Sequence, residues 1–246
     1  MHRFFSIGLL VCALSAQTTS LINGTAEGSF EGAGTFCSGS GTIAGWTVVN
    51  GNPFTADWAV GSQVGAAHGN NSIFIAINAI CTQAGYPANP SYFHFYRDIT
   101  LPTGQPHVKL TLKLQGSLRI NSTTGERADI LRVFLAFSTY TPSAGSDVSS
   151  SYWIANFFQL FIPTRQWRTF NIPLNCLQGG QTYRLIFTYV RTNVTASPPS
   201  AAPFVAIDSI AAISSYPGFR RKWLLGEYVH NCSYNTGTGS YWWASL

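Results

Sequence analysis

Apolar and polar residues alternate with a period of two along most of the chain. Segment 108–114 is the clearest case, because its sequence VKLTLKL puts one valine and three leucines on one side and two lysines and a threonine on the other. Successive side chains of a strand point to opposite faces, so this pattern predicts a strand with one face against a core. Further segments that alternate or are continuously apolar occur at 47–50, 57–60, 72–78, 92–99, 130–137, 154–162, 168–172, 183–189 and 204–213.

Turn-forming residues such as Asn52-Pro53, Pro102-Thr103-Gly104 and Gln178-Gly179-Gly180 separate these segments, and no window has the spacing of an amphipathic helix. Many strands joined by turns predict an all-β fold, a two-sheet antiparallel β-sandwich of jelly-roll type. Such sandwiches often run to about 200–250 residues as a single domain. We therefore expect one domain over residues 17–215.

The two ends of the chain depart from this pattern. Residues 1–16 begin with the basic Met1-His2-Arg3, continue as a short apolar run and end in small residues, which is typical of a cleaved secretory signal peptide. The apolar run is too short to span a bilayer, so we expect a secreted or cell-surface protein with no transmembrane segment in the mature chain. Residues 216–246 are expected to form an irregular tail, with a docking strand or the remnant of a longer protein as alternatives.

The composition bears on the kind of partner. Charged residues make up only 9% of the sequence, against about 25% in an average soluble domain. The formal net charge is +5, but the basic residues are scattered apart from a cluster at 220–222. Proteins that bind nucleic acid gather Lys and Arg on one face, so nucleic acid is not an expected partner. A surface of hydroxyls, amides and rings suits an extracellular protein that contacts sugars or other proteins.

The sequence has five cysteines, and Cys12 leaves with the signal peptide. The remaining four, Cys37, Cys81, Cys176 and Cys232, allow three pairings. A disulfide between Cys37 and Cys81 is favoured, because both lie in loops of the N-terminal half and an oxidising compartment permits it. No CxxC pair is present, so the pattern supports neither a zinc site nor thioredoxin-type redox chemistry.

Motifs of known catalytic centres are missing from the sequence, which has no GxSxG elbow, no HExxH and no phosphate-binding glycine loop. Glycosidases use two carboxylates that face each other across the substrate. Glu126 and Asp129 are spaced so that strand alternation would put them on opposite faces. We therefore predict that the protein is not an enzyme, with a secreted hydrolase as a minor alternative.

Three acidic residues are candidate metal ligands: Glu31, Asp57 and Asp208. Asp208 is the most informative, because it lies inside the otherwise apolar segment VAIDSI at 205–210. A carboxylate there needs a metal, a cationic partner or several hydrogen-bond donors. Calcium is the hard cation that takes carboxylate and carbonyl oxygens from separate loops. The alternatives are that Asp208 faces solvent or accepts backbone N–H bonds.

Tryptophans are the candidate ligand contacts, because an indole ring can stack on a sugar. Packing within the sandwich is the simpler explanation for Trp46, Trp58, Trp153 and Trp167. Adjacent residues on a strand point to opposite faces, so at least one ring of Trp242 and Trp243 would be exposed. The predicted ligand-binding residues are Trp153, Trp242 and Trp243.

The order of several short segments resembles a known group of domains. The segments are FEG at 30–32, GWTVVN at 45–50, WAVG at 58–61, NSIFI at 71–75, HFYRDITLP at 94–102, DILRV at 129–133, WRT at 167–169 and AIDSI at 206–210. Over residues 24–214 the chain resembles the jelly-roll domains of Bacteroidetes secreted surface proteins, the choice-of-anchor or cleaved-adhesin-like group with MAM-like relatives. Two features depart from that group: Leu112-Lys113-Leu114 replaces an aromatic-rich, acidic strand end, and no C-terminal sorting domain is recognisable.

The resemblance implies a jelly-roll module for adhesion or carbohydrate binding, with a structural calcium held through Glu31, Asp57 and Asp208. Together with the residue patterns it predicts a secreted, non-catalytic module that binds a glycan or a cell-surface protein. The main alternative is a structural spacer domain of a larger adhesin that has no ligand of its own.

Overall fold

The computed structural model describes residues 17–32, 34–37, 39–50, 57–78, 80–87, 89–158, 160–162, 166–193 and 205–216. These residues form thirteen β-strands and one short 3₁₀ turn, η1 (Ser150–Tyr152), with no α-helix among them. The predicted signal peptide, Cys232 and the predicted tail beyond Tyr216, with Trp242 and Trp243, lie outside the described residues. Within the described part of the chain, no helix is long and apolar enough to cross a membrane.

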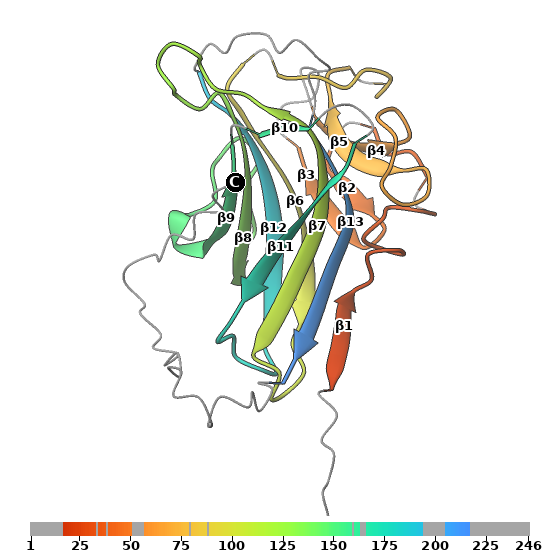
Figure 1. The fold of residues 1–246 in the computed structure, drawn as a ribbon, viewed down its shortest axis with the longest axis vertical. Coiled ribbons are helices and arrows are strands. Elements are labelled where there is room, and N and C mark those ends of the chain that lie inside the picture. The colour runs from red at the N-terminus through yellow and green to blue at the C-terminus, as the bar shows by residue number, and fades with distance from the viewer. Residues whose placement is uncertain are drawn as a thin grey trace, which may run out of the picture.

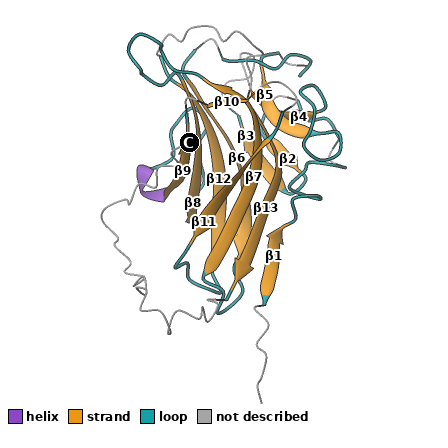
Figure 2. Cartoon of the chain, viewed as in Figure 1, coloured by secondary structure: helices purple, strands orange, loops and turns teal. Residues whose placement is uncertain are grey.

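The strands make two antiparallel sheets packed face to face (Figure 1; Figure 2). Sheet A contains, in spatial order, β10 (Leu160–Ile162), β7 (His107–Leu118), β13 (Val205–Ser215), β5 (Ser72–Ala76) and β4 (Asp57–Gly61); in addition β1 (Thr18–Ile22) pairs with β13 and β11 (Arg168–Leu174) pairs with β7. Sheet B contains β2 (Gly41–Ile43), β3 (Trp46–Val49), β6 (Ser91–Thr100), β12 (Thr182–Arg191), β8 (Asp129–Phe137) and β9 (Trp153–Phe157). The predicted all-β jelly-roll sandwich is confirmed.

The core lies between the inner faces of the two sheets, as the alternation predicts. Leu110, Leu112 and Leu114 of β7 are fully buried on the sheet A side. On the sheet B side, Phe95 of β6 and Phe187 of β12 stack with their ring centroids 4.8 Å apart. Each large apolar side chain removed from water stabilises the fold by about 1.5–3 kcal/mol. The inward-facing side chains of the strands are therefore occupied by core packing, and a binding or catalytic site has to be formed by outward-facing side chains or by the loops.

Two parts of the strand prediction differ from the structure. Segment 154–162 was expected to be one strand, but it contains β9 in sheet B and β10 in sheet A, because the chain crosses between the sheets after Phe157. Strands β1 and β2 were not predicted. They have five and three residues, respectively, and a period of two is not recognisable over so short a length.

Strand β13 changes its partner half-way along sheet A (Figure 1). Its first half pairs with β5 through Ala206 and Ile207, and its second half pairs with β1 from Ala212 to Ser215. The register of β13 against β7 shifts between Asp208 and Ala211, which marks a β-bulge at the point of change. At the bulge Ile210 N–H donates to the Gly28 carbonyl of the N-terminal turn 23–32, and Asp208 accepts N–H groups of the loop 62–71.

Candidate functional site

Two of the predicted metal ligands, Glu31 and Asp208, converge on the loop 62–71. Asp208 Oδ2 accepts backbone N–H bonds from Ala67 and His68, at 2.6 and 2.8 Å. Glu31 Oε1 accepts the N–H groups of Asn70 and Asn71, at 2.8 and 2.6 Å. Asp208 Oδ1 accepts a fifth, from Ser209, at 2.6 Å. The loop is thus held from the N-terminal turn and from β13 at once, and we call this arrangement the carboxylate clasp.

Burial governs the acidity of the clasp. The Asp208 side chain is fully buried, which raises its pKa from 3.8 to about 6, while the three backbone N–H bonds lower the pKa and the charge of Glu31 raises it further. Gly69 makes the approach of Glu31 possible, because a Cβ there would lie 2.3 Å from Glu31 Cδ. The sequence leaves several environments open for Asp208, and the structure shows the one in which its carboxylate accepts backbone N–H bonds.

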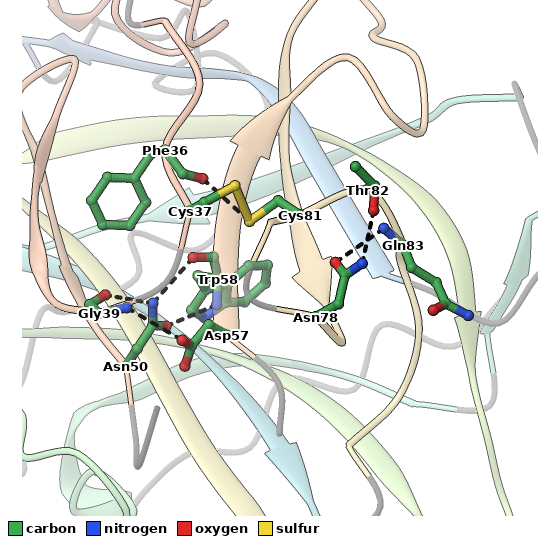
Figure 3. The surroundings of a disulfide bond; sticks show 10 residues. All are labelled: Phe36, Cys37, Gly39, Asn50, Asp57, Trp58, Asn78, Cys81, Thr82 and Gln83. Carbon is green, nitrogen blue, oxygen red and sulfur yellow. Dashed lines mark hydrogen bonds between the residues drawn. A yellow bond between two sulfur atoms is a disulfide. The ribbon is translucent and has the colours of Figure 1, made fainter. Parts of the chain in front are cut away.

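Asp57 does not join this pair. It lies at the start of β4, in register with Ala76, whereas the loop 62–71 connects the other ends of β4 and β5 (Figure 3). Asp57 Oδ2 accepts the N–H of Gly39 at 3.3 Å, and burial raises the pKa of this carboxyl to about 6. The neighbouring Asn50 binds the backbone of Gly39 and Trp58. The expectation of one site made of all three acids is therefore corrected: Asp57 belongs to a separate network.

The oxygens of the clasp do not suit calcium, which takes about six to eight oxygen ligands. Glu31 Oε1 and Asp208 Oδ2 each already accept two N–H groups, whose positive ends face the carboxylates as a cation would. In the described part of the chain no group of three His, Cys, Asp or Glu side chains comes together. The residues present do not fit the calcium ion that the resemblance implies.

Cys37 and Cys81 form a disulfide, the pairing favoured from the sequence, with their Cα atoms 5.6 Å apart (Figure 3). The bond joins the segments before β2 and after β5, on the outer face of sheet A. Beneath it lies a small cluster of buried side chains, among them Ala59, Phe74 and Ala206. Cys176 is also disulfide-bonded. This covered half of sheet A offers packing rather than an open binding face.

The tryptophans separate into two groups. Trp46 and Trp58 are fully buried in the core and are thereby excluded as ligand contacts. Trp153 and Trp167 are half-buried, Trp167 against the cluster under the disulfide and Trp153 on the outer face of sheet B. Of the three predicted ligand-binding residues, only Trp153 lies in the described part of the chain.

Four polar residues form a row across the outer face of sheet B: His94, Thr188, Arg132 and Asn156, from β6, β12, β8 and β9. The His94 Nδ1 and Thr188 Oγ1 atoms are 2.9 Å apart, and His94 Nε2 lies 3.0 Å from the Ser143 carbonyl oxygen. These partners fix the neutral tautomer in which Nε2–H donates to Ser143 and Nδ1 accepts from the threonine. Burial lowers the pKa of His94 to about 4. The row is thus neutral at its β6 end.

The β9 end of the same row carries polar atoms that the described residues leave unused. Arg132 forms an ion pair with Asp147 and its guanidinium lies 4.9 Å from the Trp153 ring centroid. Within the described chain, however, the buried Arg132 Nε donor and the Asn156 Oδ1 acceptor have no hydrogen-bond partner. Arg132 and Asn156 are opposite one another in register. A buried donor and a buried acceptor therefore lie on neighbouring strands beside the half-buried Trp153.

An apolar row runs next to the polar one and consists of Tyr96, Ile186, Phe134 and Trp153. The loop 138–149 crosses its centre, where Val148 packs on Phe134 and Ile186. Tyr140 and Tyr152 flank the same cluster with their ring centroids 5.2 Å apart. The loop leaves the two ends of the row half-exposed, at Tyr96 and Trp153. Sheet B thus has an outer face of mixed rings and hydrogen-bonding groups.

The two carboxylates considered for hydrolysis have unrelated surroundings. Asp129 is fully buried; its oxygens accept bonds from Arg119 Nε at 2.5 Å, from the Tyr189 hydroxyl at 2.5 Å and from Arg191 at 3.3 Å. Glu126 is exposed and accepts a bond from Thr124. Asp129 is thus committed to a structural ion-pair network that a substrate does not reach.

A surface pocket of about 600 Å³ lies beside the clasp, between the N-terminal turn and β2. Glu27, Glu31, Phe36 and Ile43 are among the residues that line it. Glu27 lies 3.7 Å from Arg97, so one of the two carboxylates is already paired. The outer face of sheet B combines more of the features of a ligand site: half-buried aromatic residues, a polar row and hydrogen-bonding atoms without a partner among the described residues.

Comparison with known proteins adds information about the fold only. No protein-family model and no curated protein matches the sequence. Among solved structures, the enzymatically active domain of bacteriophage CBA120 tailspike protein 4 matches with a TM-score of 0.44 and 11% identity, over 78% of this chain and 21% of that one. The K3 cleaved adhesin domain of Lys-gingipain from Porphyromonas gingivalis has a TM-score of 0.42 and 13% identity, over 80% of this chain and 99% of its own. TmCBM61 in complex with β-1,4-galactotriose gives 0.38 and 12%, over 78% and 97%.

These similarities are distant and do not decide between functions. Function has to be argued from the outer face of sheet B. None of the four members of its polar row was predicted as a site residue, because each is a single polar position in a separate strand: His94, Thr188, Arg132 and Asn156. Only the strand order and register bring them together.

Proposed function

We propose that this protein is a secreted, non-catalytic β-sandwich module that binds a neutral glycan on the outer face of sheet B, beside Trp153. The observation that carries the proposal is the position of half-buried Trp153 at one end of the apolar row, beside the Arg132 and Asn156 end of the polar row. Arg132 Nε and Asn156 Oδ1 are buried without a hydrogen-bond partner among the described residues, so a sugar hydroxyl that reaches them as these side chains move finds one donor and one acceptor.

The charges of this face favour a neutral sugar. Arg132 is paired with Asp147, and Arg184 is paired with Asp98 through two bonds of 2.7 and 2.9 Å. His94 is neutral above about pH 4. Among the described residues of this face these pairs leave no unpaired charge to attract a uronate, a sulfate or an amino sugar. Trp153 and Tyr96 are half-buried, each with an arginine guanidinium over its ring, and they are the aromatic residues at the two ends of the apolar row.

The test is binding of the mature chain to a panel of soluble polysaccharides, followed by titration of the best one. Trp153→Ala should weaken the affinity more than about 10-fold, in line with the loss of a hot-spot ring. Asn156→Ala should weaken it by a smaller factor by removing one acceptor. Tyr216→Ala is the matched control, because this exposed tyrosine follows the end of β13 in the other sheet and should leave the affinity unchanged.

Two outcomes would reject the proposal. Equal affinity of the wild type and Trp153→Ala would move the site elsewhere, and the double variant Trp242→Ala/Trp243→Ala would then test the other predicted ligand-binding residues. Absence of binding to every polysaccharide would favour a spacer domain or a protein partner. Release of reducing ends from a bound polysaccharide would contradict the non-catalytic assignment.

A further inference from the structure

We infer that backbone amides take the place of a cation at the carboxylate clasp, so that the fold and its ligand binding are independent of calcium. The inference concerns the junction of the N-terminal turn, the loop 62–71 and the bulge of β13. It is independent of which ligand the outer face of sheet B binds.

The first step is the charge balance at the clasp. Two carboxylates lie close enough for the charge of Glu31 to raise the pKa of Asp208. Among the described residues no ion pair reaches either of them, since the carboxylates that pair with arginine are those of Glu27, Asp98, Asp129 and Asp147. Lys113 is opposite Asp208 in register but is not within ion-pair distance. Something other than a basic side chain must stabilise the two negative charges.

The second step is the supply of donors. Five backbone N–H groups end on three of the four carboxylate oxygens, at 2.6–2.8 Å. A carboxylate that accepts two or three backbone N–H bonds is strongly stabilised in its charged form. Successive N–H groups that face inward make a concave surface for an anion, which is the electrostatic opposite of a cation site. Ala67–His68 and Asn70–Asn71 are two such successive pairs.

The third step is the position of the clasp in the fold. At the bulge β13 changes its partner from β5 to β1, and the regular pairing of β13 with β7 is interrupted. Hydrogen bonds of the clasp join the segments there: Asp208 binds the middle of the loop, at Ala67 and His68, and Glu31 of the N-terminal turn binds its C-terminal end, at Asn70 and Asn71. Ile210 N–H also donates to the Gly28 carbonyl at 2.9 Å. Hydrogen bonds therefore connect all three segments.

The experiment is thermal unfolding of the mature chain in 5 mM EGTA and in excess calcium. We expect the two Tm values to agree within about 1–2 °C, whereas calcium bound at 100 times its Kd would raise Tm by about 5–10 °C. Hydrogen exchange gives the local reading: the amides of Ala67, His68, Asn70 and Asn71 should be protected equally in both conditions.

Two variants separate the halves of the clasp. Asp208→Asn should speed exchange at Ala67 and His68, and Glu31→Gln at Asn70 and Asn71, each by more than about 10-fold, with or without calcium. Asp98→Asn, an exposed carboxyl of sheet B, is the control and should change none of these amides. A calcium-dependent rise in Tm that both clasp variants abolish would overturn the inference, as would loss of protection at the four amides when calcium is added. The wild-type comparison decides the matter even where a variant does not fold.

Discussion

Asp129, Asp208 and His94 are all fully buried polar residues, yet each meets the cost of leaving water by a different route. Two arginines and a tyrosine compensate Asp129, three backbone amides compensate Asp208, and His94 stays neutral between a hydroxyl and a carbonyl. The sequence identified Asp208 as needing compensation but left the route open. Which groups compensate the buried carboxylate depends on which loop lies next to it in the fold, and the spacing of residues along the chain does not contain that information.

The depressed pKa of His94 makes its contribution to stability depend on pH. The unfolded state takes up a proton near pH 6.5 and the folded state only near pH 4, so the free energy of unfolding falls as the pH is lowered between these values. For this residue we expect a loss of about 2–3 kcal/mol from pH 7 to pH 4.

Urea unfolding at several pH values should show this loss in the wild type and not in His94→Gln. The raised pKa values of Asp57 and Asp208 act in the opposite direction, since the folded state then binds protons more tightly than the unfolded state. The wild type and His94→Gln share the contribution of these two aspartates, so the difference between their pH profiles isolates the contribution of His94. Parallel profiles would show that the imidazole is accessible to protons in the folded state.

At the scale of elements, the sequence predicts long strands well and junctions poorly. Strands β7, β8, β12 and β13 follow from patterns of seven residues or more, and their cores match the predicted inward positions. The crossing between β9 and β10 and the bulge in β13 were not foreseen. The crossing and the bulge both depend on which strands are neighbours in the sheet, whereas the sequence pattern shows only the alternation within one strand.

The contact between the N-terminal turn and the bulge can be tested at Gly28. A Cβ at this position would lie 1.8 Å from the backbone oxygen of Ile210, which cannot move without breaking the junction. Gly28→Ala should therefore lower the free energy of unfolding by about 1–3 kcal/mol or more.

Gly61→Ala is the matched control for this change. Its Cβ would meet only side-chain atoms of Thr35 and Phe74, at 3.7 and 3.9 Å, which is ordinary contact. We expect an effect within about 0.5 kcal/mol in urea unfolding. Equal effects of the two alanines would mean that the turn at 23–32 moves away from β13 at little cost.

For the molecule as a whole, the secretory leader, the paired cysteines and the sandwich form a consistent prediction from the sequence. The disulfide joins residues 44 positions apart and covers part of the outer face of sheet A. Cys37→Ser with Cys81→Ser should lower the free energy of unfolding by about 2–4 kcal/mol, mainly because the unfolded chain is no longer cross-linked. Glycan binding on sheet B, on the other side of the core, should persist in the folded fraction.

Reducing buffer should lower the free energy of unfolding less in the double variant than in the wild type, because only the Cys176 disulfide is left to reduce. An unchanged free energy of unfolding in the variant would show that the loops keep their positions without the bond.

The candidate ligand site could be predicted only at Trp153, because a tryptophan can be recognised in the sequence by itself. The row of His94, Thr188, Arg132 and Asn156 forms only when four strands lie side by side.

The pairing of β1 with β13 has a consequence for how this domain can be joined to other chains. Thr18 at the start of β1 is the direct partner of Ser215 at the end of β13, so their Cα atoms lie about 5 Å apart. The polypeptide thus enters and leaves the sandwich at one point, in opposite directions. A host protein could accept the whole unit inside a surface loop without separating the loop's two ends.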